Sequence, residues 1–208
     1  MAYGFLDIAA TPSVRAAQEA NGSGDYWGNF QGARESARFT AAEADFIARR
    51  DSFYMATVSE TGWPYVQHRG GPPGFLRLLD DKTLALADFR GNRQYISIGN
   101  LAAENRAALI LMDYPHRRRL KIYARIEARD LSADPVLAAK LEMPGYSAKV
   151  ERALVIHLEA FDWNCPQHIT PRFTEAELAE ALRPVRERME QLEAENGALR
   201  EKLSGVGG

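Results

Sequence analysis

The residues best suited to chemistry in this chain of 208 residues are arginines beside two glycine-rich loops. Arg69 ends an expected strand and precedes a Gly-Gly pair, so its guanidinium is placed to bind a phosphate with two hydrogen bonds. Arg90 and Arg93 flank a second loop, in which Asn92 is expected to cap a short helix over residues 93–98. The N-terminus of a helix binds anions through its free backbone N–H groups. Together the two loops suit one phosphate monoester.

The sequence offers few alternatives to anion binding. Its four histidines, His68, His116, His157 and His168, have no metal-ligand spacing, and His157 is expected to be a core residue. The sequence contains no G-x-S-x-G elbow, no P-loop lysine and no G-x-G-x-x-G motif. A single cysteine, Cys165, excludes a disulfide framework and a cysteine-based zinc cluster. We therefore expect neither a metal site nor a hydrolytic triad.

Composition and charge narrow the class of protein further. Apolar residues make up 46% of the chain, which is enough for a packed core. The 26 basic and 28 acidic side chains leave a net charge of −2, so neither nucleic acid nor an anionic membrane is an expected partner. No apolar run approaches the roughly 18 residues of a membrane span. The N-terminal residues do not resemble a secretory signal, and we expect a soluble, cytoplasmic protein.

Short strands position the two loops. Six are expected in the first part of the chain, at residues 53–59, 64–69, 75–79, 83–87, 107–112 and 120–127, and a last one at residues 154–160. Residues 107–112 form a continuous apolar run that predicts burial on both faces, whereas residues 120–127 alternate and predict one solvated face. Residues 161–172 are expected to be irregular. Closely spaced antiparallel strands predict a mainly β fold built on a small barrel, with flanking helices.

Capping signals place the helices and divide the chain. Thr40 and Glu43 form a capping box that begins a helix over residues 41–50. Asp134-Pro135 opens another helix, and a second capping box at residues 174–177 begins the terminal one. The expected organisation is an N-terminal arm (1–39), a barrel domain (40–173) and a C-terminal helix (174–208).

The C-terminal helix shows the strongest periodicity in the chain. Apolar residues and one asparagine recur at alternating steps of three and four, at Leu182, Val185, Met189, Leu192, Asn196, Leu199 and Leu203. This heptad pattern predicts a coiled coil, and Asn196 at an a position favours a parallel, two-stranded register. Pro184 is expected to break or kink the helix, so that the coiled coil begins near Val185. A single amphipathic helix packed on its own domain is the alternative.

Residues 53–130 resemble the split-barrel flavin family related to pyridoxamine 5′-phosphate oxidase. The resemblance is carried, in order, by Met55-Ala56-Thr57-Val58-Ser59 with Gly62-Trp63-Pro64, Leu84-Ala85-Leu86-Ala87-Asp88 with Gly91-Asn92-Arg93-Gln94, Asn105-Arg106-Ala107-Ala108-Leu109, and residues 118–126. It implies a homodimer of six-stranded antiparallel split β-barrels with FMN at the subunit interface.

The resemblance also implies which residues contact the flavin. They are Gln67, His68, Arg69 and Gly70 along the ring and ribityl chain, Ala87 and Asp88 through the backbone, Asn92, Arg93 and Gln94 at the phosphate, Arg119 and Lys121 near the ring from the other subunit, and Trp163 over the ring. Two positions depart from the family's oxidases. Gln67 stands where they have a phosphate-binding arginine, and Pro72 where they have a substrate lysine.

These departures favour a flavin protein with a different substrate. We predict an FMN-dependent oxidoreductase that acts, as a homodimer, on a small molecule other than the vitamin B6 phosphate. One alternative is a binding module that holds flavin or haem without turnover, with His68 or His168 as a haem ligand. Another is a scaffold whose function lies in the coiled coil.

Overall fold

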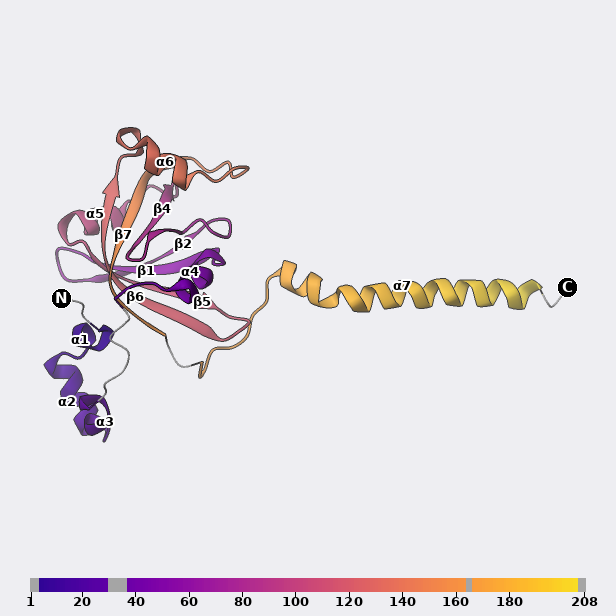
Figure 1. Ribbon diagram of the computed structural model, residues 1–208, viewed down its shortest axis with the longest axis horizontal. Coiled ribbons are helices and arrows are strands. Elements are labelled where there is room, and N and C mark those ends of the chain that lie inside the picture. Colours follow the sequence, from indigo (N-terminus) through magenta and orange to yellow (C-terminus); the bar gives the residue numbers. More distant parts are fainter. Residues whose placement is uncertain (1–3, 30–36, 164–165, 206–208) are drawn as a thin grey trace. The chain divides into compact units, whose positions relative to one another are not determined.

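A curled antiparallel sheet forms the centre of the protein, as the computed structural model shows (Figure 1). The structure describes residues 4–29, 37–163 and 166–205, so parts of the predicted N-terminal arm, residues 164 and 165 of the predicted irregular segment and the last three residues lie outside it. The strands are β1 (Ser52–Val58), β2 (Pro64–Gly70), β3 (Arg77–Asp80), β4 (Thr83–Phe89), β5 (Arg106–Asp113), β6 (Arg118–Arg129) and β7 (Val150–Trp163). The helices are α1 (Phe5–Ala9), α2 (Pro12–Ala20), α3 (Gly24–Gly28), α4 (Ala41–Ala48), α5 (Ile96–Ala103), the 3₁₀ turn η1 (Leu131–Ala133), α6 (Pro135–Leu141) and α7 (Glu175–Gly205).

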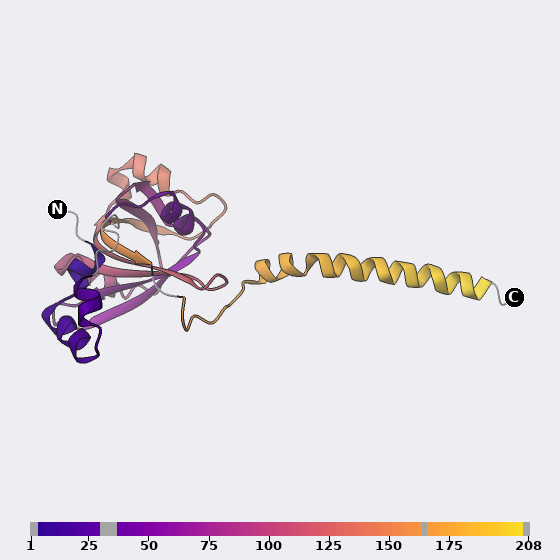
Figure 2. The same cartoon turned by 60° about the horizontal axis from the view of Figure 1, so that its bottom comes forward.

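The sheet has the strand order β2-β1-β5-β6-β7-β4-β3 and wraps around one core (Figure 2). Buried side chains from five of its strands meet inside, among them Met55, Leu84, Leu111, Ile122 and Leu154. The predicted mainly β split barrel with flanking helices is confirmed. The sheet contains seven strands rather than six, because the short edge strand β3 and the late strand β7 both join it.

Two predictions about strands were wrong. β5 is not buried on both faces, since its residues alternate between buried and half-buried. Burial on both faces belongs to β4, where Leu84 and Leu86 face the barrel core and Ala85 and Ala87 pack beneath α6. In addition, β7 continues to Trp163 through residues predicted to be irregular, because it pairs with β6 along that length.

The capping box of α4 is confirmed and reaches further than expected. The Glu43 carboxylate accepts hydrogen bonds from the Thr40 backbone N–H at 2.9 Å and from the Trp163 indole N–H at 2.7 Å. Glu43 is only 5% exposed, and the adjacent Phe46 and Ile47 lie in the core. Through Glu43, the start of α4 is therefore joined to the end of β7.

Residues 114–116 and 169–208 form a compact unit separate from the rest of the chain. Its long helix α7 extends from Glu175 to Gly205 with Pro184 inside it, so of the predicted break or kink the break did not occur. Arg183 pairs with Glu180 at 2.9 Å and with Glu187 at 3.3 Å, and these two ion pairs bracket the proline. Within the described part of the chain, no helix is long and apolar enough to cross a membrane.

Candidate functional site: an arginine-lined cleft

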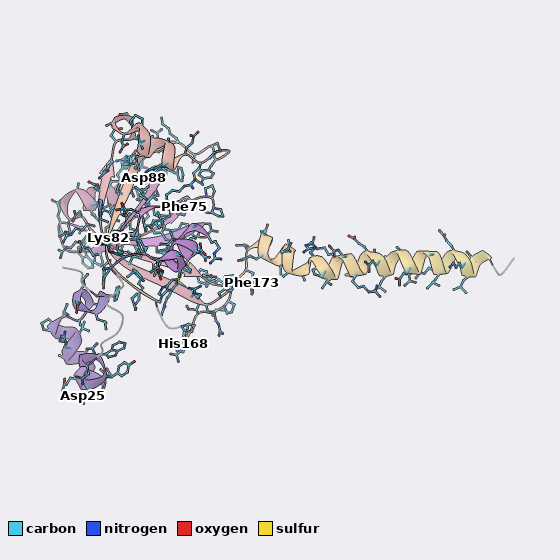
Figure 3. The ribbon with its side chains drawn as sticks, in the orientation of Figure 1. Asp25, Phe75, Lys82, Asp88, His168 and Phe173 are labelled. Carbon is cyan, nitrogen blue, oxygen red and sulfur yellow. The ribbon has the colours of Figure 1, made fainter. Side chains whose placement is uncertain are left out.

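A small cleft lies where β2, the end of β4 and the turn before α5 meet. Its walls include Gln67, Arg69, Asp88, Asn92, Arg93 and Ser97; Figure 3 labels Asp88 near the end of β4. Its volume is about 50 Å³. Since a water molecule occupies about 30 Å³, this space suits a phosphate-sized group and is too small to enclose a flavin ring.

Strand alternation decides which predicted residues reach the cleft. Gln67 and Arg69 pair with Met55 and Phe53, whose side chains face the core, so both lie on the inner face of the sheet. His68 lies on the outer face, with its ring edge-on to Tyr54 at 5.5 Å. Residues 67–70 therefore do not form one wall of the cleft, because their side chains alternate between the two faces of the sheet.

A network of opposite charges lines the cleft. The Asp88 carboxylate is buried and forms ion pairs with Arg69 and, at 3.4 Å, with Arg152. Glu151 accepts hydrogen bonds from Arg90 at 2.8 Å and from the Tyr95 hydroxyl at 3.1 Å.

The charges in this network do not balance. The hydrogen bond from Arg90 lowers the pKa of the Glu151 carboxyl, which stays ionised. With Arg93, four guanidinium groups accompany two carboxylates. Arg69 and Arg93 are in the cleft walls and Arg90 and Arg152 lie beside them, so the cleft and its surroundings together carry excess positive charge.

Several donors in this network lack an acceptor. The Arg69 Nε is buried and makes no hydrogen bond, and the buried Arg152 Nε has only the 3.4 Å ion pair with Asp88. Arg93 is exposed and forms no hydrogen bond or ion pair with any residue that the structure describes. A buried donor without an acceptor costs about 1–3 kcal/mol. An anion in the cleft would remove this cost, so the residues present fit a phosphate group.

The turn that carries Arg93 differs from the prediction. The helix expected to begin at Arg93 begins at Ile96, because Arg93 and Tyr95 have φ angles of 62° and 53° that no right-handed helix allows. Asn92 caps no helix; its side-chain oxygen instead accepts the Gln94 backbone N–H at 3.1 Å. The helix also continues past Gly99. Non-glycine residues at positive φ are strained and concentrate at functional sites.

The structure adds residues to the cleft that the sequence did not indicate. The Ser97 hydroxyl donates to the Gln67 side-chain oxygen at 2.7 Å. Arg152 lies directly opposite Asp88 in the pairing of β4 with β7. The signal for Arg152 was present in the sequence, since a last strand begun at Val150 rather than at Leu154 would have included it.

Arg119 and Lys121 do not reach this cleft within one chain. Both lie on β6, which is separated from β2 by β1 and β5. The Lys121 ammonium pairs with Asp162 at 2.7 Å and lies 4.6 Å from the centre of the Phe5 ring. The Nε atom of Arg119 is buried without a hydrogen bond. Any role for these two residues at the cleft requires a second copy of the chain.

Trp163 and the remaining histidines also lie outside the cleft walls. The Trp163 ring packs edge-on against Phe46 at 4.7 Å, so it closes the barrel at α4. His157 is not a core residue as predicted; it is exposed and contacts Glu127 at 3.0 Å. His168 is exposed, with a φ of 62°. No group of three or more His, Cys, Asp or Glu side chains could hold a metal within the described ranges.

The fold defines a split-barrel protein, and an arginine-lined cleft lies beside its edge strand β2. The chain belongs to the pyridoxamine 5′-phosphate oxidase family, whose model matches residues 39–154, more than half of the sequence. No curated protein matches the chain.

Several solved structures are similar to this chain. HupZ of Group A Streptococcus is 16% identical, with a TM-score of 0.46 over 65% of this chain and 99% of its own. A Clostridium acetobutylicum protein related to general stress protein 26 of Bacillus subtilis is 16% identical, with a TM-score of 0.45 over 65% and 94%. An FMN-binding protein from Syntrophomonas wolfei is 14% identical, with a TM-score of 0.44 over 74% and 95%.

Proposed function

We propose that the protein is an FMN-binding oxidoreductase that holds the flavin phosphate in the arginine-lined cleft. The observation that carries this proposal is the pair of guanidinium groups in the walls of a space of phosphate size, Arg69 with a buried Nε that makes no hydrogen bond and the exposed Arg93. Membership of the pyridoxamine 5′-phosphate oxidase family supports it. Bound flavin would supply the electron transfer, while the chain's own residues bind and orient it.

Several of the predicted contacts have a role in this proposal. Arg93 and the turn around Asn92 hold the phosphate, Arg69 and Gln67 follow the ribityl chain, and the backbone at Asp88 meets the ring. The positive charge of Arg119 and Lys121 approaches the ring from a second copy of the chain. Because Asp88 already neutralises part of Arg69, Arg93 is the main phosphate ligand.

We also propose a homodimer formed through the outer face of β1 and β2. Tyr54 and Val58 of β1 and Val66 of the edge strand β2 are 39%, 40% and 61% exposed there. Such a patch suits a protein interface. A second copy on this face would remove apolar surface from water and bring its own β6 residues toward the cleft.

The proposed dimer is extended by α7 as a parallel coiled coil. The residues at its a and d positions are exposed, including Leu182, Met189, Leu192 and Leu199. In a parallel pair, Asn196 meets its own copy and the two amides hydrogen-bond. In the antiparallel pairing that sets Met189 against Leu192, Asn196 would face Val185 and lose that partner.

The charges beside the coiled-coil seam support the same orientation. Each g position of a parallel pair faces the e position five residues further along the other helix. Arg188 at g then faces Glu193 of the second copy, and Glu195 at g faces Arg200 of the second copy. Both contacts join opposite charges.

Titration of the purified protein with FMN, followed by quenching of flavin fluorescence, tests the proposed function. Arg93→Ala should weaken FMN binding roughly 10- to 100-fold, because a hydrogen bond to a charged group contributes about 1.5–3 kcal/mol. Arg106→Ala is the matched control, since Arg106 is exposed and pairs only with the neighbouring Glu104. Equal affinity in the two variants, or no binding by the wild type, would contradict the proposal. Reduction and reoxidation of the bound flavin then separate an enzyme from a module that only binds.

A further inference from the structure

A second and larger cavity lies on the outer side of β4 and β7. It is bounded by α6 and by the loop of residues 142–149, and we call it the α6 pocket. Its walls include Ala87, Phe89, Ala138, Met143, Tyr146 and Val150. Its volume of about 570 Å³ falls within the roughly 300–1,000 Å³ of small-molecule sites.

The pocket exists because small residues face each other where α6 ends. Deeper under the helix, Leu137 and Leu141 fill the space against Ala85 and Ala153. Past Leu141 the helix ends, and four of the lining side chains are alanines that leave space between the walls: Ala87, Ala138, Ala139 and Ala148. Tyr146 returns over the opening, edge-on to Phe89 with ring centres 5.0 Å apart. The result is a space with aromatic walls.

A β-bulge joins this pocket to the arginine-lined cleft. Asp88 pairs with Arg152 and Phe89 pairs with Val150, so Glu151 is an extra residue in β7. The bulge turns Glu151 into the cleft and Val150 into the α6 pocket. Phe89 lines both spaces. The two cavities therefore share a wall but differ in chemistry.

The lining of the α6 pocket disfavours anions. Glu142 is the only charged residue in its walls, and no arginine or lysine lines it. The walls are otherwise aliphatic, aromatic and glycine or proline, which bind through apolar contact. The arginine-lined cleft has the opposite character, with a surplus of guanidinium groups.

We propose that the α6 pocket binds an uncharged, flat and largely apolar ring compound. This binding needs no flavin. We also propose that such compounds are the substrates. This second step rests on the proposed function, because only a flavin in the neighbouring cleft would act on them. A substrate that carries a phosphate, as vitamin B6 phosphate does, finds no cation in these walls.

Binding of N-phenyl-1-naphthylamine to the full-length protein tests the proposal, because this uncharged probe becomes fluorescent when it leaves water. We expect saturable one-to-one binding that weakens at least tenfold in Ala138→Phe and in Ala148→Phe, which fill the pocket from two different segments. Ala102→Phe places the same ring on an exposed position of α5 and should leave binding unchanged. Circular dichroism verifies that each variant is folded.

The sulfonated form of the same probe, 8-anilino-1-naphthalenesulfonate, tests the charge preference. It should bind at least tenfold more weakly than the uncharged probe. Unsaturable binding, binding in both filled variants as tight as in wild type, or tighter binding of the sulfonate would overturn the proposal. Wild type that binds the probe but not FMN would refute only the flavin function, whereas wild type that binds FMN but not the probe would refute only the pocket.

Discussion

Removal of the Glu43 carboxylate should destabilise the barrel far more than the loss of an ordinary helix cap. Glu43 accepts hydrogen bonds from the Thr40 N–H and hydroxyl and from the Trp163 indole. Loss of a cap costs about 0.5–2 kcal/mol, and a partly buried indole donor left without an acceptor adds about 1–3 kcal/mol. Glu43→Ala should therefore lower the free energy of unfolding by about 2–4 kcal/mol.

Denaturant unfolding followed by tryptophan fluorescence measures this loss. The chain contains a matched control in Glu177, which forms the same capping box with Thr174 at the exposed start of α7. Glu177→Ala should cost less than about 1 kcal/mol, measured by circular dichroism, because no buried donor is left unpaired. A loss in Glu43→Ala no greater than that in Glu177→Ala would refute the reasoning.

The same carboxylate predicts a dependence of stability on pH. Burial by itself raises the pKa of Glu43, but hydrogen bonds from Thr40 and Trp163 outweigh burial and leave the pKa below its ordinary value of 4.5. A pKa lowered by folding contributes stability above pH 4.5 that is lost as the pH falls through the folded value. The stability difference between wild type and Glu43→Gln should therefore shrink below pH 4.5. A constant difference from pH 7 to pH 3 would contradict this.

Further perturbations test the cleft and the assembly. Asp88→Asn should lower the free energy of unfolding by about 3–5 kcal/mol, since it leaves buried guanidinium charge without its counterion, and sulfate should raise the melting temperature of this variant more than that of wild type. Val66→Glu should shift the dimer toward monomer in analytical ultracentrifugation, while Val136→Glu, an equally exposed valine on α6, should not. Asn196→Leu should raise the helix melting temperature and relax the two-stranded state, because the buried amide that specifies it is gone; an unchanged melting temperature would contradict a coiled coil through this face.

Local signals made much of the fold predictable. The capping boxes at Thr40 and Thr174 depend on residues three apart in sequence, so they form wherever the helix forms. The alternating apolar and polar residues of β6 indicate one buried face, and the heptad repeat of α7 indicates one apolar stripe. Family resemblance then connected a set of short strands to a split barrel.

The sequence by itself determined which segments are strands, where α4, α6 and α7 begin and that arginines and glycines gather in two loops. Only the tertiary structure decided how these residues are used. Arg69 of β2 forms an ion pair with Asp88 of β4. Arg152 lies opposite Asp88 because β4 pairs with β7, and the two residues are more than 60 positions apart in sequence. The positive φ of Arg93 and the cover of α6 over β4 likewise depend on packing partners distant in sequence. The periodicity of the sequence shows which side chains share one face of a helix or strand, but tertiary packing decides which residues that face contacts.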